Sequence, residues 1–372
     1  MINYISIENF RCFQQSTFKN FSNINLIGGL NNSGKSALLE AILLLLSPQL
    51  ETITLLNKYR NEIVTKKNTF DKTWDYLFFN ANKSQPIKLS TTSNLYHHEY
   101  CLAIRKSEND QFNNVAFYEK LKNSNEKKLE QALKDFELFT LKQNIIHSLD
   151  LYITDNELED SFIGSFSFTD SGRLTMLETP TYLFNQVAYR PAKQIISPSQ
   201  LSKLLDITID KGYLNDIIQT IKIIDYSIID IRVIENKVLL SRDKVSYLPI
   251  SLFGDAITST LSMILTLFSL DENGFLLIDE VENGIHHSKH LNFIKHISDL
   301  ALRRNIQIFM TTHSSEFIKS FNEYSLEDKT LSDKLCYTEL LRTRKNRIIN
   351  NLIEPDVLKY KIDHSKKFRG EQ

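Results

Sequence analysis

GGLNNSGKSALLEAI, residues 28–42, is a loop of glycine, asparagine and serine that runs directly into an apolar segment. Its centre, from Gly29 to Ser36, matches the pattern G-x-x-x-x-G-K-[ST] without a mismatch. Upstream, INLIGG (24–29) predicts a short buried strand, and downstream KSALLEAILLLLS (35–47) predicts a buried helix. The alternative, a glycine turn that matches by chance, does not explain these flanks. The stretch therefore predicts a P-loop that holds the phosphates of a nucleotide.

The residue types of this loop suit a bound anion. Glycines let the backbone wrap around the anion, and the N–H groups at the start of a helix point at it with the favourable end of the helix dipole. We expect Lys35 to reach the β- and γ-phosphates of ATP and Ser36 to ligate Mg²⁺. The other loop residues that we expect to contact the nucleotide are Gly29, Asn31, Asn32, Ser33, Gly34 and Ala37.

Two acidic residues end a second apolar strand, within NGFLLIDEVENG (273–284). A carboxylate at the end of a buried strand is costly unless it is paired or lies near a cation. We expect Asp279 to hold Mg²⁺ and Glu280 to polarise the attacking water. Glu282 is interpreted as part of a solvated acidic turn.

A third apolar strand, within IQIFMTTHSSEFI (306–318), ends in Thr312 and His313. A single histidine is more often structural than catalytic. Because it follows the acidic strand in this order, we interpret His313 as a sensor of the γ-phosphate.

Composition limits the class of protein. The chain has 372 residues, 42% hydrophobic, with a net charge of −1, which predicts one large domain or a core with an insertion. The near-neutral charge gives no argument for nucleic acid or membrane binding. Cys12, Cys101 and Cys336 form no CxxC pair, so we expect a reducing, cytoplasmic setting without structural zinc. MINYISIENF lacks a signal-peptide pattern, and the longest apolar run is too short to span a bilayer.

The sequence resembles the ABC-type ATPases, in particular the SMC, RecF and OLD (overcoming lysogenisation defect) group of stand-alone ATP-binding proteins. ISIENFRCF (5–13) resembles the first strand of the group, and DEVENGIHHS (279–288) resembles its joined Walker B motif and D-loop. TTHSSEF (311–317) resembles the switch-histidine segment, and residues 248–270 occupy the place of the ABC signature. The resemblance covers the first 48 residues and 227–322.

The resemblance implies a dimer in which two heads sandwich two ATP molecules. Each signature segment then caps the γ-phosphate held by the P-loop of the other head. Here the candidates are Ser251, Gly254 and Asp255; Ser251 lies three residues before Gly254 instead of two, and Leu252 takes the aligned serine position. Gly254 is therefore the main candidate, and the alternative is a loop that only opens a core helix. The resemblance also implies that Arg11, after the first strand, approaches the nucleotide phosphates.

The implied fold is α/β: a P-loop ABC-type ATPase head, with a mixed β-sheet and flanking helices, that carries an inserted α+β or helical subdomain. We assign residues 1–48 and 227–345 to the head, 49–226 to the insertion, and 346–372 to a basic C-terminal segment that packs on the head. No sustained heptad pattern is present, so the long SMC coiled coil is not expected.

Local patterns predict the elements between the two head blocks. Alternation and β-branching predict strands within 85–93, 99–106, 114–119, 162–170 and 172–179, and helical spacing predicts a helix within 125–143. Ser197 is the expected N-cap of a helix that begins at Pro198, and Asn236 the expected turn between two strands.

Some conspicuous residues favour ordinary interpretations. His286, His287 and His290 have a spacing that zinc could use, but they follow the acidic strand where the D-loop is expected. The aromatic residues of TWDYLFFNAN (73–82) are predicted to be core residues and not a stacking platform for the base; they are Trp74, Tyr76, Phe78 and Phe79.

The resemblance implies an ATPase subunit that forms a dimer or a larger assembly on ATP in a bacterial anti-phage defence system. Full-length OLD members carry a Toprim nuclease that needs a D-x-D pair, which this chain lacks. We therefore expect a separate effector, a nuclease or a toxin. The alternative is a RecF- or SMC-like ATP-gated DNA-binding protein of repair or maintenance; from Cys336 onward nine Lys/Arg face five Asp/Glu, which leaves DNA as a possible partner. The wide motif spacing disfavours a transporter subunit.

Overall fold

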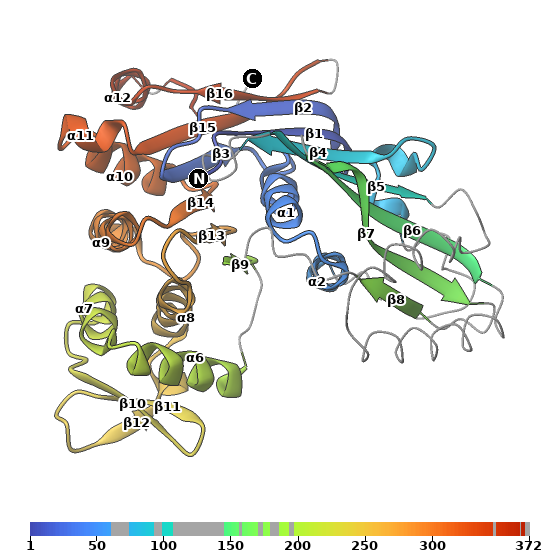
Figure 1. Ribbon diagram of the computed structural model, residues 1–372. Helices are drawn as coiled ribbons and strands as arrows, with labels where there is room; N and C mark the ends of the chain where they lie inside the picture. The colour runs from blue at the N-terminus through green and yellow to red at the C-terminus, as the bar shows by residue number, and fades with distance from the viewer. Residues whose placement is uncertain are drawn as a thin grey trace.

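The computed structural model in Figure 1 describes residues 1–60, 74–92, 99–106, 145–155, 158–169, 174–178, 186–192, 197–344, 347–364 and 366–368. The strand expected within 114–119 and the helix expected within 125–143 lie outside these residues.

A six-stranded sheet carries the sequence motifs. Five of its strands are parallel and one edge strand, β16, is antiparallel. Across the sheet the strands are β16 (Ile348–Leu352), β15 (Leu335–Arg342), β3 (Ile24–Gly29), β14 (Gln307–Thr311), β13 (Phe275–Ile278) and β9 (Val187–Arg190). Every residue of β3, β13 and β14 is buried, as expected for parallel strands covered on both faces. The parallel pairing brings the segments that follow these three strands to one edge of the sheet.

The helix that follows the glycine-rich loop lies between two sheets. This helix, α1 (Lys35–Leu46), is buried almost all round, and its leucines share one core with both sheets. The second sheet is antiparallel; across it the strands are β2 (Phe13–Lys19), β1 (Tyr4–Phe10), β4 (Ile87–Thr92), β5 (Glu99–Lys106), β6 (Ile145–Asp155), β7 (Leu158–Thr169) and β8 (Leu174–Glu178). The helix α2 (Leu50–Tyr59) continues from α1 beneath this sheet (Figure 1).

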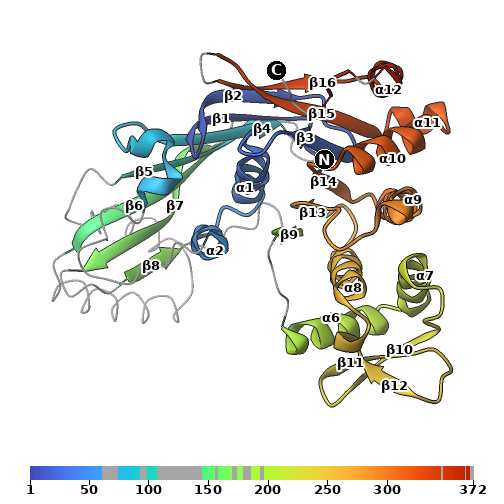
Figure 2. The ribbon, with the colours of Figure 1, turned by 180° about the vertical axis from the view of Figure 1, so that it is seen from behind.

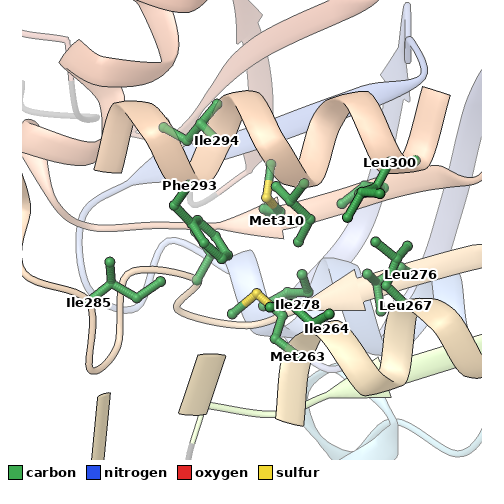
Figure 3. Packing of buried hydrophobic residues seen from close by; sticks show 14 of the residues in the cluster. Met263, Ile264, Leu267, Leu276, Ile278, Ile285, Phe293, Ile294, Leu300 and Met310 are labelled. Carbon is green, nitrogen blue, oxygen red and sulfur yellow. The ribbon is translucent and has the colours of Figure 1, made fainter. Parts of the chain in front are cut away.

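Helices cover the other face of the six-stranded sheet. Figure 3 shows side chains from α8 (Asp255–Ser269) and α9 (His290–Arg303) meeting those of β13 and β14, among them Met263, Ile278 and Phe293. The other helices within the described residues are α6 (Pro198–Asp210), α7 (Leu214–Ile224), α10 (Ser315–Ser325), α11 (Lys329–Ser332) and α12 (Pro355–Asp363). Alternate residues of one strand therefore enter two different cores, and the sheet is fixed from both sides.

A small antiparallel sheet packs beyond α8 and α6. It consists of β10 (Asp230–Ile234), β11 (Lys237–Ser241) and β12 (Tyr247–Pro249). Seen from behind in Figure 2, it lies at the opposite end of the molecule from β16. The chain passes from β12 through a short 3₁₀ turn, Ile250–Leu252, to the start of α8.

Several local predictions are confirmed. Ser197 caps α6 with a capping box to Gln200, and Pro198 is its first residue. The turn between β10 and β11 uses Glu235 and Asn236 at positive φ, 50° and 57°. None of the described helices is long and apolar enough to cross a membrane.

The domain boundaries stay a prediction. In the structure β9, from the segment 49–226, pairs with β13 inside the six-stranded sheet, and β16, from 346–372, pairs with β15. The β9–β13 pairing joins residues that are far apart in sequence, which local patterns do not specify, whereas β15 and β16 are neighbours in sequence.

Candidate functional site

One large pocket, of about 820 Å³, opens at the edge of the sheet where β3, β13 and β14 end. It brings together most of the site residues predicted from sequence. Those that line it are Arg11, Asn31, Asn32, Ser33, Gly34, Lys35, Ser36, Ala37, Asp279, Glu280 and His313. Gly29 lies at the end of β3, directly beneath this loop.

The two glycines of the loop are required by its conformation. Gly29 and Gly34 have φ of 149° and 99°. A Cβ on Gly29 would lie 2.6 Å from Ser33 Oγ, and one on Gly34 would lie 3.1 Å from Cys12 Sγ. A side chain at either position would therefore be strained and crowded. Gly34 is also the residue that opens α1, so the loop ends on the N-terminus of that helix.

Lys35 is held over the loop. Its Nζ donates hydrogen bonds to the carbonyl oxygens of Gly29, at 2.8 Å, and Leu30, at 2.9 Å. Burial lowers the pKa of the Lys35 ammonium group, and the nearby carboxylates of Asp279, Glu282 and Glu280 oppose this shift. The Lys35 ammonium group, at the N-terminus of α1, is therefore placed to bind the negatively charged phosphates of a nucleotide.

Asp279 is a buried carboxylate held by two hydroxyl groups. Its Oδ1 accepts a hydrogen bond of 2.5 Å from Thr311 Oγ1, and the Ser36 hydroxyl bonds to it as well. Burial raises the pKa of the Asp279 carboxyl group, and the charge of Glu280 adds to this rise. A buried carboxylate beside a serine hydroxyl at the loop is a set of oxygen donors that fits a hard divalent cation.

Glu280 follows in an unusual backbone conformation. Its φ is 51°, and its N–H donates to Thr311 Oγ1 at 2.9 Å. Its Oε2 accepts a hydrogen bond of 2.8 Å from Asn283 Nδ2. Thr311, at the end of β14, therefore fixes both acidic residues at the end of the neighbouring strand, and Asn283 orients the second one. Such strained conformations persist where surrounding contacts hold them.

Glu282 is a functional candidate that the sequence interpretation missed. The expectation of a solvated turn is wrong, because only 9% of its side chain is exposed. Its Oε1 accepts hydrogen bonds from the N–H groups of His313, at 3.0 Å, and Ser314, at 3.2 Å, and lies 3.2 Å from His313 Nδ1. Glu282 thus ties the histidine segment to the turn that follows the acidic strand. The signal in the sequence is a third acidic residue only two positions after Glu280.

Arg11, directly after β1, also lines the pocket. Its guanidinium is 6% exposed and donates from Nε to Glu40 Oε2, at 3.0 Å, and from Nη1 to the carbonyl of Tyr76, also at 3.0 Å. Glu40 of α1 also pairs with Arg60, at 2.7 Å. The carboxylate on the P-loop helix therefore positions two arginines that both line the pocket.

The predicted signature segment lies elsewhere. Ser251, Gly254 and Asp255 are exposed, and none is among the described residues that line the pocket. Gly254 has φ of 87° and opens α8, and a Cβ there would meet nothing within 4 Å. Leu252 beside it is 69% exposed. The structure therefore does not bring this segment to the P-loop of its own chain.

The structure also tests the interpretations of the three histidines and of the aromatic residues in 73–82. His290 is buried with its Nε2 3.0 Å from the carbonyl of Ile285, whereas His286 is exposed, bonds to Ser288 and has its ring centroid 4.1 Å from that of His287. Among the described residues, these histidines form no group of three that could hold a metal. Among the aromatic residues of 73–82, the core prediction is confirmed for Trp74 and Phe78. It is wrong for Tyr76, which is 57% exposed and lines the pocket, and Phe79, which is half-buried, lines the pocket as well.

A parallel sheet whose first strand leads through a phosphate-binding loop into a buried helix, with an acidic pair on a neighbouring strand, defines a P-loop ATPase. The family described as AAA ATPase domain matches residues 1–318, and the chain belongs to that family. The protein is thus an ATPase that binds a nucleotide.

Two curated relatives are similar in sequence. An ATP/GTP phosphatase of Helicobacter pylori is 27% identical over 342 residues, which cover 87% of this chain and 88% of the relative. The uncharacterised protein MJECL10 of Methanocaldococcus jannaschii is 31% identical over 114 residues, 31% of this chain and 50% of that protein.

Two solved structures are similar in shape. The SMC head domain of Thermotoga maritima has a TM-score of 0.41 at 11% identity, over 95% of this chain and 99% of that one. An SMC head bound to the C-terminal winged-helix domain of ScpA has a TM-score of 0.47 at 11% identity, over 95% and 98%.

Proposed function

We propose that this ATPase is an Mg²⁺-dependent, ATP-driven subunit that assembles with a second copy of itself and regulates a separate effector, a nuclease or toxin, in bacterial anti-phage defence. The proposed assembly with a second copy rests on one observation: the predicted signature segment lies apart from the predicted phosphate-binding residues of the same chain. The P-loop, the acidic pair and His313 line one pocket, whereas Gly254 lies exposed outside it.

Within one chain the residues have distinct roles. Lys35 and the loop N–H groups bind the phosphates, and Arg11 approaches them from the turn after β1. Ser36 and Asp279 would hold Mg²⁺, which would neutralise charge on the phosphates. Glu280, oriented by Asn283, accepts the proton of the attacking water, and His313 contacts the γ-phosphate.

In the proposed assembly, the second copy supplies the signature segment that is missing from the pocket of one chain. Gly254 opens a 15-residue helix and is exposed together with Asp255, and a helix N-terminus attracts a phosphate group. We infer that the Ser251–Asp255 segment of one copy caps the γ-phosphate in the pocket of the other. ATP then holds the two copies together, and hydrolysis releases them.

The effector and the defence role rest on the resemblance of the motifs to the OLD group. A relative that is aligned over most of its length carries the name ATP/GTP phosphatase, which fits a nucleotide-hydrolysing chain. Purification of the intact protein with its neighbouring gene products, with and without ATP, tests whether a nuclease or toxin associates with it.

Glu280→Gln tests the catalytic assignment. The amide keeps the hydrogen bond from Asn283 but cannot take a proton, so we expect hydrolysis to fall by about a hundredfold or more, with ATP affinity retained. The ATP-bound assembly should accumulate, as measured by light scattering.

Glu272→Gln, in the exposed turn before β13, is the matched control and should leave hydrolysis unchanged. Normal turnover in Glu280→Gln would remove Glu280 from its role.

A further inference from the structure

The segment 74–82, which precedes β4, divides its aromatic side chains between the core and the pocket. It forms two short 3₁₀ turns, Asp75–Leu77 and Phe79–Ala81. Trp74 and Phe78 enter the core, with Trp74 4.8 Å from the ring of Phe166. Tyr76 and Phe79 instead line the pocket, and Tyr76 is 57% exposed.

This segment is firmly attached to the end of β1. The N–H of Arg11 donates to the carbonyl of Leu77 at 2.7 Å, and its guanidinium donates to the carbonyl of Tyr76 at 3.0 Å. Phe10 forms a β-bridge with Phe78, and Asn9 Nδ2 donates to the carbonyl of Asn82 at 2.9 Å. The backbone that carries Tyr76 and Phe79 is therefore fixed.

An ion pair links the start of the segment to the residue that follows it. Lys83 Nζ lies 2.6 Å from Asp75 Oδ1. Asn80 and Ala81 keep φ of 50° and 57°, conformations that are costly unless neighbouring contacts hold them. A rigid support lowers the entropy lost when a ligand binds to it.

The lining of the pocket is of two chemical kinds. The P-loop, Asp279, Glu280 and His313 suit phosphates and a cation. Tyr76 and Phe79 add aromatic side chains, and Arg11 donates to the carbonyl of Tyr76. A nucleoside triphosphate whose phosphates lie on the P-loop must place its sugar and base within the remaining volume. An exposed aromatic side chain in that volume offers a surface on which a planar base gains by stacking.

We propose that Tyr76 and Phe79 form the platform on which the purine base of the nucleotide stacks. This inference deepens the proposed function and rests on it for the position of the phosphates. Stacking depends on the ring and not on the hydroxyl group, so phenylalanine should replace Tyr76, whereas alanine should not.

The experiment compares ATP with inorganic tripolyphosphate, which carries the same phosphates but no base. In the full chain, Tyr76→Ala should weaken ATP binding about tenfold or more and leave tripolyphosphate binding unchanged, as measured by calorimetry. Tyr76→Phe should bind ATP like the wild type. Tyr226→Ala is the matched control, because Tyr226 is 85% exposed and is not among the described residues that line the pocket.

Unchanged ATP affinity in Tyr76→Ala, or an equal loss of ATP and tripolyphosphate binding, would overturn the platform and leave the phosphate site standing. A wild-type protein that binds neither ligand would instead overturn the proposed function. Lys35→Ala separates the two ideas, since it should weaken both ligands through the phosphates.

Discussion

At the scale of single residues, the turn after the acidic strand does more than connect two elements. Glu282 contacts His313, and Asn283 contacts Glu280, so two adjacent side chains each hold one proposed catalytic group. Ser259 of α8 donates to the carbonyl of Asn283 at 3.0 Å. A buried carboxylate that accepts two backbone N–H groups is costly to remove, because the donors would lose their partner. Glu282 and Asn283 are therefore positioning residues for the reaction.

Glu282→Gln separates the charge from the hydrogen bonds. The amide oxygen can still accept from the N–H groups of His313 and Ser314, so the loop should remain folded. The charge opposite His313 Nδ1 is lost, and we expect kcat to fall about tenfold with KM unchanged. Steady-state kinetics measure both constants.

A double-mutant cycle with His313→Ala distinguishes this role from a general loss of stability. If Glu282 acts through the histidine, Glu282→Gln should change kcat little once His313 is gone. Glu316→Gln, exposed in the first turn of α10, is the control. Additive losses in the cycle would contradict the positioning role.

At the scale of elements, the sequence predicts what depends on local pattern and misses what depends on pairing. The apolar runs at 24–29 and 306–318 predict buried strands because parallel strands are covered on both faces, and both are found. The join of β9 to β13 follows from a tertiary contact across a long stretch of chain. The same holds within the site. Thr311 contacts the acidic pair because β14 lies beside β13. The spacing of residues in the sequence does not predict that these two strands are neighbours.

The start of α8 allows a prediction with a closely matched control. Gly254 and Gly212 both have positive φ, 87° and 85°, and a Cβ on either would meet nothing within 4 Å. Alanine at each position therefore brings backbone strain, about 1–3 kcal/mol, without a clash. Gly212 lies between α6 and α7, away from the signature segment. The two variants differ in where the strain falls.

We expect Gly254→Ala to retain ATP binding by the single chain and to lose ATP-dependent assembly and most of the hydrolysis. Gly212→Ala should behave like the wild type in both respects, apart from a small loss of stability. Calorimetry measures binding, and light scattering measures assembly. Equal behaviour of the two variants would show that Gly254 has no role beyond its backbone conformation.

At the scale of the whole molecule, the two sheets and the helical layer hold the phosphate-binding loop and the acidic pair in a fixed geometry. The helix α1 is buried between the sheets, so its N-terminus and the P-loop keep their place. The exposed Gly254 segment opens α8 next to the small sheet, with Leu252 and Val245 largely exposed, at 69% and 84%. Such exposed apolar side chains suit the contact with another copy that we propose.

Mixing two inactive variants tests whether the site is shared between copies. In a two-fold dimer, a chain with Lys35→Ala and a chain with Gly254→Ala leave one site with both defects and the other site intact. Random pairing of equal amounts should therefore restore about a quarter of the wild-type hydrolysis rate, since half of the dimers carry one intact site of two. The control mixes Lys35→Ala with Glu280→Gln. Both of those residues line the pocket of the same chain, so every mixed dimer has two defective sites and activity should not return. A Lys35→Ala and Gly254→Ala mixture no more active than its parts would contradict the shared site, and would place all the groups needed for hydrolysis within one chain.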